Sequence, residues 1–259
     1  RFLLPGVTVN THPLLPKLRQ LRLSGILQTL DLRAAQATER QLSPVEFFAL
    51  LLDDELERRG QQRLVHNMAL SGCNSLKTLA HFDFLAAPGV DRTLIQDLAT
   101  CAFIPRHENI LLCGPTGVGK SHLANALAVE ALKRNFRVLS RPTHRLLNDL
   151  YTARASGAHP RLMARTLRCD LLVLDDFGLQ TLSAQAVQDL YEIITERYER
   201  GSLIITSNRA FEEWAEIFNN DLLASAALDR LTHHAHTLVI RGDSFRQRSR
   251  KKDPLTPPT

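Results

Sequence analysis

The sequence predicts an α/β protein in which a five-stranded parallel sheet lies between helices, preceded by a small all-helical domain. After residue 103, short apolar runs of strand type alternate with helical stretches, an order typical of parallel sheets. The first of these runs leads through a glycine-rich loop directly into a helix. Before residue 85, leucines recur at steps of three and four without strand-type runs, which predicts helices alone.

Four segments follow from these patterns. A helical N-terminal domain covers 1–85; within it, residues 1–10 are expected to be disordered or foreign to the natural chain, because the sequence begins without Met. The breaker sequence at 86–89 opens a linker and lead-in helix over 86–102. The α/β core covers 103–241, and a basic C-terminal tail covers 242–259.

Two helices are predicted in the N-terminal domain. The first spans 12–37, where leucines are interleaved with basic residues. The second begins with a capping box, in which Ser43 is the N-cap, Pro44 the first helical residue and Glu46 the third residue after the cap. One apolar face of this helix is formed by Val45, Phe48, Leu52 and Leu56, and resumes beyond Gly60 at Leu64 and Met68.

In the core, strands and helices are predicted in alternation. The strands are Ile110–Cys113, Arg137–Ser140, Leu171–Asp175, Leu203–Ser207 and Thr237–Ile240. The helices are His122–Asn135, Thr143–Ala155, Arg161–Leu167 and Ser183–Arg200, with a short helix at Arg92–Thr100 before the first strand.

The glycine-rich loop has the pattern of a phosphate-binding loop, G-x-x-x-x-G-K-[ST]. Its glycines leave room for several backbone N–H groups to point together at a polyphosphate. Lys120 brings a positive charge to the β- and γ-phosphates, and the Ser121 hydroxyl is placed to ligate Mg²⁺. The predicted ATP-binding residues are Gly114, Pro115, Thr116, Gly117, Val118, Gly119, Lys120, Ser121 and His122.

Two strands of the core end in polar residues suited to phosphate chemistry. Asp175 and Asp176 follow the apolar run beginning at Leu171, so Asp175 is expected to hold Mg²⁺, partly through water, and Asp176 to orient or deprotonate a water molecule. Asn208 follows the next strand and is a candidate to reach the γ-phosphate; a plain turn residue is the alternative. Arg230 and Arg246 are candidate cations, although a solvated arginine is the ordinary default.

Composition limits the class of protein. The net charge of +5 is compatible with an anionic partner without identifying one. No apolar run approaches the roughly 20 residues that cross a bilayer, so a cytoplasmic location without a membrane partner is expected. The four cysteines are scattered, which predicts reduced thiols and no Cys metal site.

Two basic clusters are candidates for nucleic-acid contact. Arg58, Arg59 and Arg63 lie together on the second helix, and either contact phosphate or form a solvated face with i,i+4 pairs. The segment 241–252 carries six Lys and Arg residues against the single acid Asp243, and is either a nucleic-acid contact or a solvated tail.

Taken in order, these motifs resemble the AAA+ ATPases of the initiator and helicase-loader group. Within that group the sequence is most similar to the IstB transposition helpers, with the DnaC helicase loader as a relative. The specific part of the resemblance is Asp-Asp-Phe-Gly-Leu at 175–179, followed by Thr-Ser-Asn at 206–208 and Gly-Asp-Ser-Phe-Arg at 242–246. It covers about residues 12–248 and implies an AAA+ core without a helical lid domain.

The resemblance implies roles for four residues. Asp176 stands where many of these ATPases have a catalytic glutamate, so its shorter side chain leaves its strength as a base open. Asn208 matches the sensor-1 position, and Arg246 matches the second sensor arginine. Arg230 matches the arginine finger, which acts in the site of a neighbouring subunit. With Lys120 and Asp175, these residues form the predicted catalytic set.

The implied function is that of an ATPase, stimulated by DNA and by assembly, which forms a ring, spiral or filament on duplex DNA and assists the transposase of its insertion element. A bacterial, DNA-associated location goes with it. One alternative is a DnaC-like loader that binds single-stranded DNA and a replicative helicase. A second is a metabolic kinase with a small-molecule acceptor, for which no acceptor-binding residues are found in the sequence.

Overall fold

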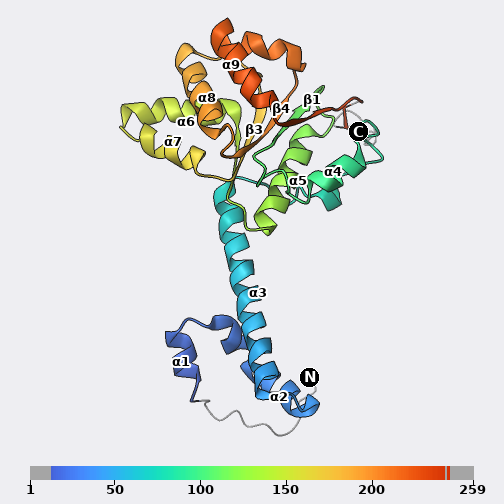
Figure 1. Cartoon of the computed structure of the whole chain (residues 1–259), viewed down its shortest axis with the longest axis vertical. Coiled ribbons are helices and arrows are strands. Elements are labelled where there is room, and N and C mark those ends of the chain that lie inside the picture. Colours follow the sequence, from blue (N-terminus) through green and yellow to red (C-terminus); the bar gives the residue numbers. More distant parts are fainter. Residues whose placement is uncertain (1–12, 243, 246–259) are drawn as a thin grey trace, which may run out of the picture. The chain divides into compact units, whose positions relative to one another are not determined.

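A computed structural model describes residues 13–242 and 244–245 of the protein (Figure 1). The chain forms two compact units, divided between His66 and Asn67. The division lies before the predicted boundary at residue 85, because the segment after Ser71 packs on the α/β core. Most of the basic tail, including Arg246, lies outside the described residues.

The smaller unit is helical, as predicted, but the first predicted helix is two helices. α1 spans Leu15–Gln20 and α2 spans Ser24–Arg40. Arg22 between them has a φ of 56°, and the Leu23 amide donates to the Leu18 carbonyl across the turn. This left-handed turn ends α1.

α3 spans Pro44–Ser71 without a break at Gly60, and its last residues belong to the larger unit. The capping box is confirmed: the Ser43 amide donates to Glu46 Oε2 over 2.7 Å, and the Glu46 amide donates to Ser43 Oγ over 3.3 Å. Arg59 pairs with Glu55 four residues earlier, which supports the solvated-face interpretation for that arginine. The apolar face named from the sequence is exposed at Val45, Phe48, Leu52 and Leu56.

α2 and α3 are joined by polar contacts as well as by a small core of Ile26, Leu30 and Leu51. Glu55 Oε2 accepts the Gly25 amide over 2.6 Å and so caps the start of α2. A Cβ on Gly25 would lie 2.7 Å from the Glu55 Cα, which means that only glycine permits this approach. Arg33 adds an ion pair with Asp54, at 2.6 Å.

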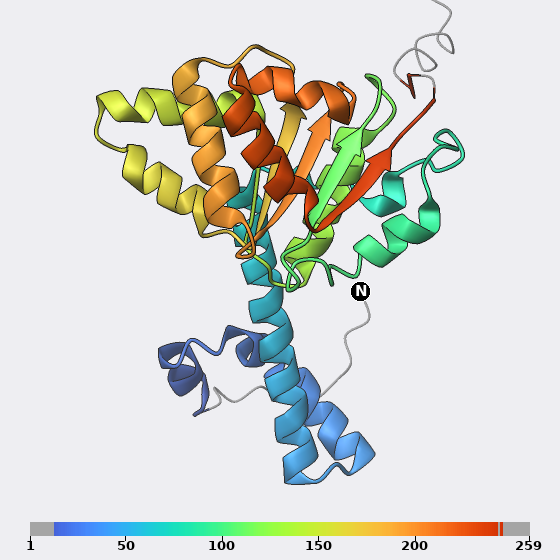
Figure 2. The same ribbon diagram turned by 45° about the horizontal axis from the view of Figure 1, so that its top comes forward.

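The larger unit is built on the predicted five-stranded sheet (Figures 1 and 2). Its strand order is β2-β3-β4-β1-β5, and every neighbouring pair is parallel. The strands are β1 Asn109–Cys113, β2 Val138–Pro142, β3 Leu171–Phe177, β4 Ser202–Ser207 and β5 Ala235–Val239. β3 continues two residues past the predicted end, and β5 begins two residues before the predicted start.

Helices cover both faces of this sheet, as its alternating buried side chains require. Leu111, Leu172 and Ile205 share one core cluster with residues of α6, α7, α8 and α9. The alternate strand residues Ile110 and Ile204 are also fully buried, and α5 packs against β1 to β4. These helices are α5 Lys120–Lys133, α6 Thr143–Ala155, α7 His159–Leu167, α8 Ala184–Arg197 and α9 Asp221–Thr232.

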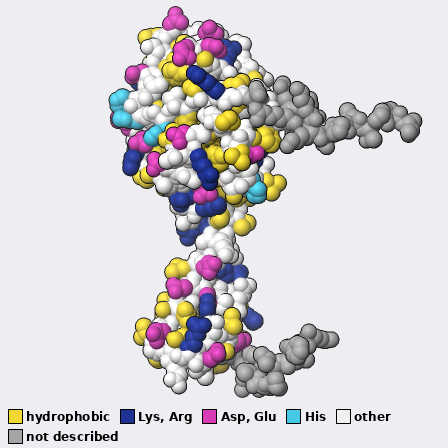
Figure 3. All heavy atoms as spheres, turned by 90° about the vertical axis from the view of Figure 1, so that its right-hand side faces the viewer, with side chains coloured by type: hydrophobic (Ala, Val, Ile, Leu, Met, Phe, Trp, Pro, Cys, Tyr) yellow, Lys and Arg dark blue, Asp and Glu magenta, His cyan; other side chains and the backbone are white. Residues whose placement is uncertain are grey.

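Three short elements complete the unit: η1 Leu79–His81, α4 Arg92–Leu98 and η2 Phe211–Phe218. Asn125 on α5 explains why 72–85 belongs here, because its side chain accepts the Asn74 amide and donates to the Asn74 and Lys77 carbonyls, each over 2.8 Å. Figure 3 shows side chains of both charges interspersed over one face of the molecule. In the described part of the chain, no helix is both long and apolar enough to span a membrane.

Candidate nucleotide-binding site

The phosphate-binding loop lies between β1 and α5, as the sequence predicts. Gly114 has a φ of 147°, and a Cβ there would lie 2.2 Å from the Ile240 carbonyl oxygen. Gly119, the residue before α5, has a φ of 99°. Both positions therefore require glycine, and they leave the backbone at the start of α5 open to an anion.

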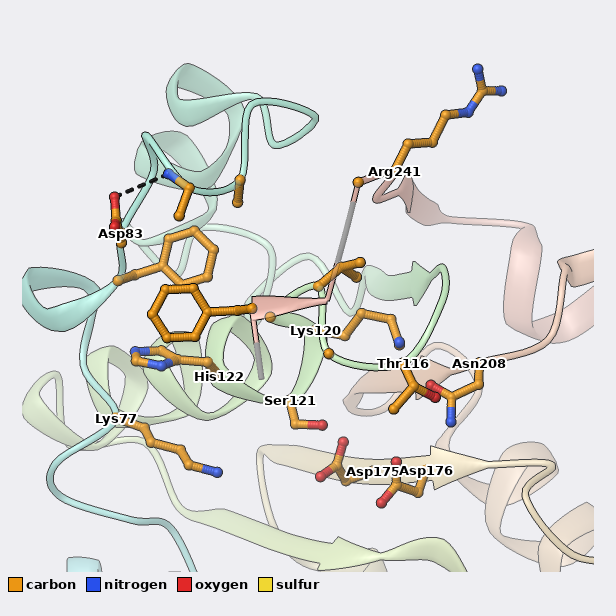
Figure 4. Close-up of a pocket in the computed structure, with 18 of the residues that line it drawn as sticks. Lys77, Asp83, Thr116, Lys120, Ser121, His122, Asp175, Asp176, Asn208 and Arg241 are labelled. Carbon is orange, nitrogen blue, oxygen red and sulfur yellow. Dashed lines mark hydrogen bonds between the residues drawn. The ribbon is translucent and has the colours of Figure 1, made fainter. Parts of the chain in front are cut away.

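A cavity of about 500 Å³ opens beside this loop, at the carboxyl ends of the parallel strands. This is where ligands bind in open parallel sheets. Figure 4 shows Ser121, Asp175, Asp176 and Asn208 grouped beside the loop. The predicted residues that line it are Thr116, Gly117, Val118, Gly119, Lys120, Ser121, His122, Asp175, Asp176 and Asn208.

Lys120 holds the loop in shape. Its side chain is buried, and its Nζ donates to the carbonyls of Gly114 and Pro115 over 2.7 Å each. An ammonium group is thus fixed beside the glycine-rich loop, and a cation next to such a loop is the arrangement that binds a polyphosphate. The cavity size, the glycine conformations and this cation fit the phosphates of ATP.

The oxygen atoms beside the loop fit Mg²⁺, which takes carboxylate and hydroxyl ligands. Ser121 is the second residue of α5, and Asp175 lies near the end of β3. Figure 4 shows the two side chains next to each other. These are the two residues predicted to hold the metal.

Thr206 on β4 orients both acids, a role that the sequence analysis missed. Its buried hydroxyl donates to Asp175 Oδ1 and accepts the Asp176 amide, the latter over 3.0 Å. Asp176 has a φ of 55°, an uncommon left-handed conformation that this contact supports. The signal was available in the sequence, since a hydroxyl residue ends an apolar strand that pairs with the strand of the two acids.

Asn208 follows β4 and is half-buried at the cavity wall. The preceding Ser207 is fully buried and donates to the Phe177 carbonyl over 2.8 Å. That bond joins the ends of β3 and β4 just beyond their register shift. The backbone directly before Asn208 is therefore held in place, which is consistent with the predicted sensor position.

Residues 77–87 form another wall of the cavity, although the sequence analysis assigned them to the helical domain and the linker. His122 Nε2 lies 2.9 Å from the Thr78 carbonyl, and its ring contacts Phe82 at 5.3 Å between centroids. Phe82 also contacts Phe84 edge to face, at 4.8 Å. The predicted site residue His122 thus connects the loop helix to an aromatic wall.

Arg230 does not reach this cavity. Its Nη1 donates to the Ala226 carbonyl over 2.7 Å, and its guanidinium lies 5.9 Å from the centre of the Tyr191 ring. The hollow that it lines also contains Asn109 and Leu203, at the amino ends of β1 and β4. Arg230 is therefore at the opposite edge of the sheet from the nucleotide site of its own chain.

The chain after β5 also contacts the loop and the cavity. The Phe245 amide donates to the Gly117 carbonyl over 3.0 Å, which brings the chain after β5 against the loop. Arg241 also lines the cavity, and Figure 4 shows its guanidinium pointing away from Lys120 and Ser121. Arg246, the predicted second sensor, is outside the described residues.

The cysteines are free thiols, as predicted. Burial raises the pKa of Cys113, which lies directly before the loop, to about 11, and does the same for Cys101. Both thiols are therefore protonated near neutral pH.

Comparisons with known proteins agree with this geometry. The chain is 35% identical over 241 residues to an insertion sequence IS21 protein of Pseudomonas aeruginosa, named as ATP-binding, covering 93% of this chain and 91% of the relative. It is 34% identical over 232 residues to the corresponding IS5376 protein of Geobacillus stearothermophilus, covering 90% and 92%.

Solved structures share the fold. The DnaC helicase loader matches with a TM-score of 0.51 and 24% identity over 57% of this chain and 87% of that one. AMPPCP-bound DnaA from Aquifex aeolicus matches with a TM-score of 0.55 and 22% identity over 70% and 55%. The core is accordingly an AAA+ P-loop fold.

The family described as IstB-like ATP binding protein matches residues 16–253, nearly the whole chain. The phosphate loop, the paired acids and the sheet order agree with that match, and the chain belongs to the IstB-like family of ATP-binding proteins.

Proposed function

We propose that the protein is an ATPase that assembles on duplex DNA and assists the transposase of its insertion element. One observation carries the proposal: the cavity gathers the loop, the candidate metal ligands Ser121 and Asp175, and the candidate catalytic residues Asp176 and Asn208, while Arg230 lies at the opposite edge of the sheet. Among the described residues that line the cavity, the cations are Lys77, Lys120 and Arg241, and the Arg241 guanidinium points away (Figure 4). An arginine that contacts the transferred phosphoryl group would therefore come from a second subunit.

The chemistry is ATP hydrolysis, for which bound ATP and Mg²⁺ supply the phosphoryl group and the metal. The loop amides and Lys120 hold the β- and γ-phosphates, and Ser121 with Asp175 would hold the metal. Asp176 accepts a proton from the attacking water or orients it, at a distance set by its short side chain. Asn208 hydrogen-bonds near the γ-phosphate.

Arg230 acts in the nucleotide site of the next subunit. A guanidinium there stabilises the charge that develops on the transferred phosphoryl group. Hydrolysis then depends on assembly, so ATP binding favours the oligomer and turnover releases it. The oligomer is a ring, spiral or filament.

Duplex DNA and the transposase are the proposed partners. The insertion-sequence context of the relatives supports the transposase. A related fold, in the replication initiator DnaA, is described with AMPPCP and single-stranded DNA. The proposed location is on bacterial DNA, in the cytoplasm.

Electron microscopy of the protein with ATP and a duplex of moderate length tests this function. We expect discrete rings, spirals or filaments that enclose DNA, and single subunits when ATP is replaced by ADP. A protein that stays monomeric with ATP and duplex would contradict the proposal. Assembly only with single-stranded DNA and a replicative helicase would favour a DnaC-like loader instead.

A further inference from the structure

α7 and its C-cap carry three arginines on one face, and the nucleotide site uses none of them. Arg161, Arg165 and Arg168 are spaced by four and three residues, so they align along the helix. All three are exposed. α7 lies beside α6 at the outer side of the sheet (Figures 1 and 2).

These arginines line a hollow of about 600 Å³ in the larger unit. It lies where β2 begins and where the chain enters β3, at the amino ends of the strands, opposite the nucleotide cavity. A fourth arginine, Arg137, borders it. The remaining lining residues are Asn67, Leu70, Val138, Leu139, Ala164 and Cys169.

Arg161, Arg165 and Arg168 have no acidic partner among the described residues that line the hollow. No acid occurs in the sequence between Asp149 and Asp170, and no carboxylate lines the hollow in the described part of the chain. Asp170 is nearby, but it is engaged by Arg137 at 2.6 Å. Hydrogen bonding to Asp170 raises the pKa of Arg137, which keeps the Arg137 guanidinium charged.

The helix that carries the arginines is held at both ends. At its start, His159 Nε2 lies 3.1 Å from the buried carboxylate of Asp189, which also pairs with Arg154. At its end, the buried Arg197 donates to the Leu167 carbonyl over 3.3 Å and to the Cys169 carbonyl over 2.8 Å. The arginine face is therefore presented by a rigid element, which lowers the entropic cost of binding.

We infer that this hollow, the α7 arginine face, binds the phosphate backbone of duplex DNA. Arg161 and Arg168 are about 10 Å apart along the helix axis, which is long enough to span neighbouring phosphates of one strand. Guanidinium groups form bidentate contacts with phosphate. No aromatic side chain lines the described hollow for stacking bases, which favours a duplex over a single strand. The inference rests on the proposed function and adds the surface that it uses.

The test compares two variants of the full chain with equal loss of charge. In the first, Arg161, Arg165 and Arg168 are replaced by Gln. In the control, the same replacement is made at three exposed cations that pair with acids and lie outside the hollow: Arg106, Lys133 and Arg200. Binding to a duplex and to a single strand is measured with ATP over a series of salt concentrations.

We expect the α7 variant to lose duplex affinity by 10- to 100-fold at about 0.15 M salt, with a salt slope smaller by about 0.9 for each lost contact. The control should stay within about threefold of the wild type. Replacement of the three arginines by Lys should keep most of the slope, since the charges remain. ATP binding should be unchanged in every variant, because the hollow is at the opposite edge of the sheet.

A second readout does not depend on affinity. A photo-crosslinking amino acid in place of Arg165 should form adducts with the duplex, and the same residue in place of Arg200 should not. The wild type could bind duplex while the α7 variant has the same salt slope as the control and residue 165 forms no adducts. That result would overturn this inference alone. Tighter binding of single strands would overturn the duplex assignment. No binding of either nucleic acid by the wild type would overturn the proposed function as well.

Discussion

The Thr206 hydroxyl donates to the carboxylate of Asp175 and accepts the backbone amide of Asp176. One side chain on β4 thus sets both acids of the candidate site on β3. This makes Thr206 a positioning residue, whose removal tests the site without touching the acids themselves.

Thr206→Val should lower ATP turnover while leaving ATP binding within a few-fold of the wild type. The hydroxyl bond to a carboxylate is worth about 1.5–3 kcal/mol, which corresponds to roughly 10- to 100-fold in kcat if Asp175 and Asp176 lose their placement. Steady-state kinetics separates kcat from KM. Thr206→Ser, which keeps the hydroxyl, should restore most of the rate, and a Val variant with normal kcat would show that the contact has no catalytic role.

Lys120→Ala should weaken ATP binding by at least about 100-fold, because charged hydrogen bonds to phosphate are lost at two oxygens. Titration with a fluorescent ATP analogue measures this. Lys133→Ala is the matched control, since Lys133 lies at the other end of α5 and pairs with Glu130 at 2.7 Å. Equal ATP affinity of the two variants would remove Lys120 from the site.

Arg230→Ala should bind ATP normally and lose hydrolysis in the DNA-bound assembly by on the order of 10³-fold. A structural role for Arg230 is separated from a role in trans by mixing subunits. Lys120→Ala subunits retain Arg230, so adding them to Arg230→Ala subunits should recover part of the activity, although each variant alone is inactive. Mixed assemblies as inactive as the separate variants, or Arg230→Ala active by itself, would contradict the role in trans.

Asp54 gives the smaller unit a defined response to acid. The hydrogen bond from Arg33 lowers the pKa of the Asp54 carboxyl to about 2. A lowered folded-state pKa means that the stability from this pair is fully present above the unfolded value near 3.8 and is lost as the pH falls toward 2. Wild type and Asp54→Asn should therefore differ most at pH 6 and converge between pH 4 and pH 2.

Hydrogen exchange of α2 amides, measured by mass spectrometry at several pH values, checks this convergence within the smaller unit. α9 in the larger unit is the internal control, because it has no contact with Asp54 in the described chain. A difference between the two proteins that persists unchanged to pH 2 would show that the Arg33 pair does not stabilise α2.

The spacing of residues in the sequence was enough to predict much of the fold. Glycine at 114 and 119, followed by Lys120 and Ser121, predicted the loop, because close approach of a backbone to phosphate tolerates few side chains. Apolar strands alternating with helices predicted the parallel sheet. The break between α1 and α2 was missed, because leucines recur at helical spacing across Arg22 even though its backbone is left-handed.

The sequence by itself determined the phosphate loop, the paired acids and the parallel order, since each follows from local spacing and period. Only the tertiary structure decided that Thr206 holds both acids, that residues 77–87 wall the nucleotide cavity and that α7 presents its arginines beside a hollow. These facts depend on which strands pair and on which segments pack against α5. Contacts between residues 30 to 50 positions apart leave no period in the chain, so they appear only once it has folded.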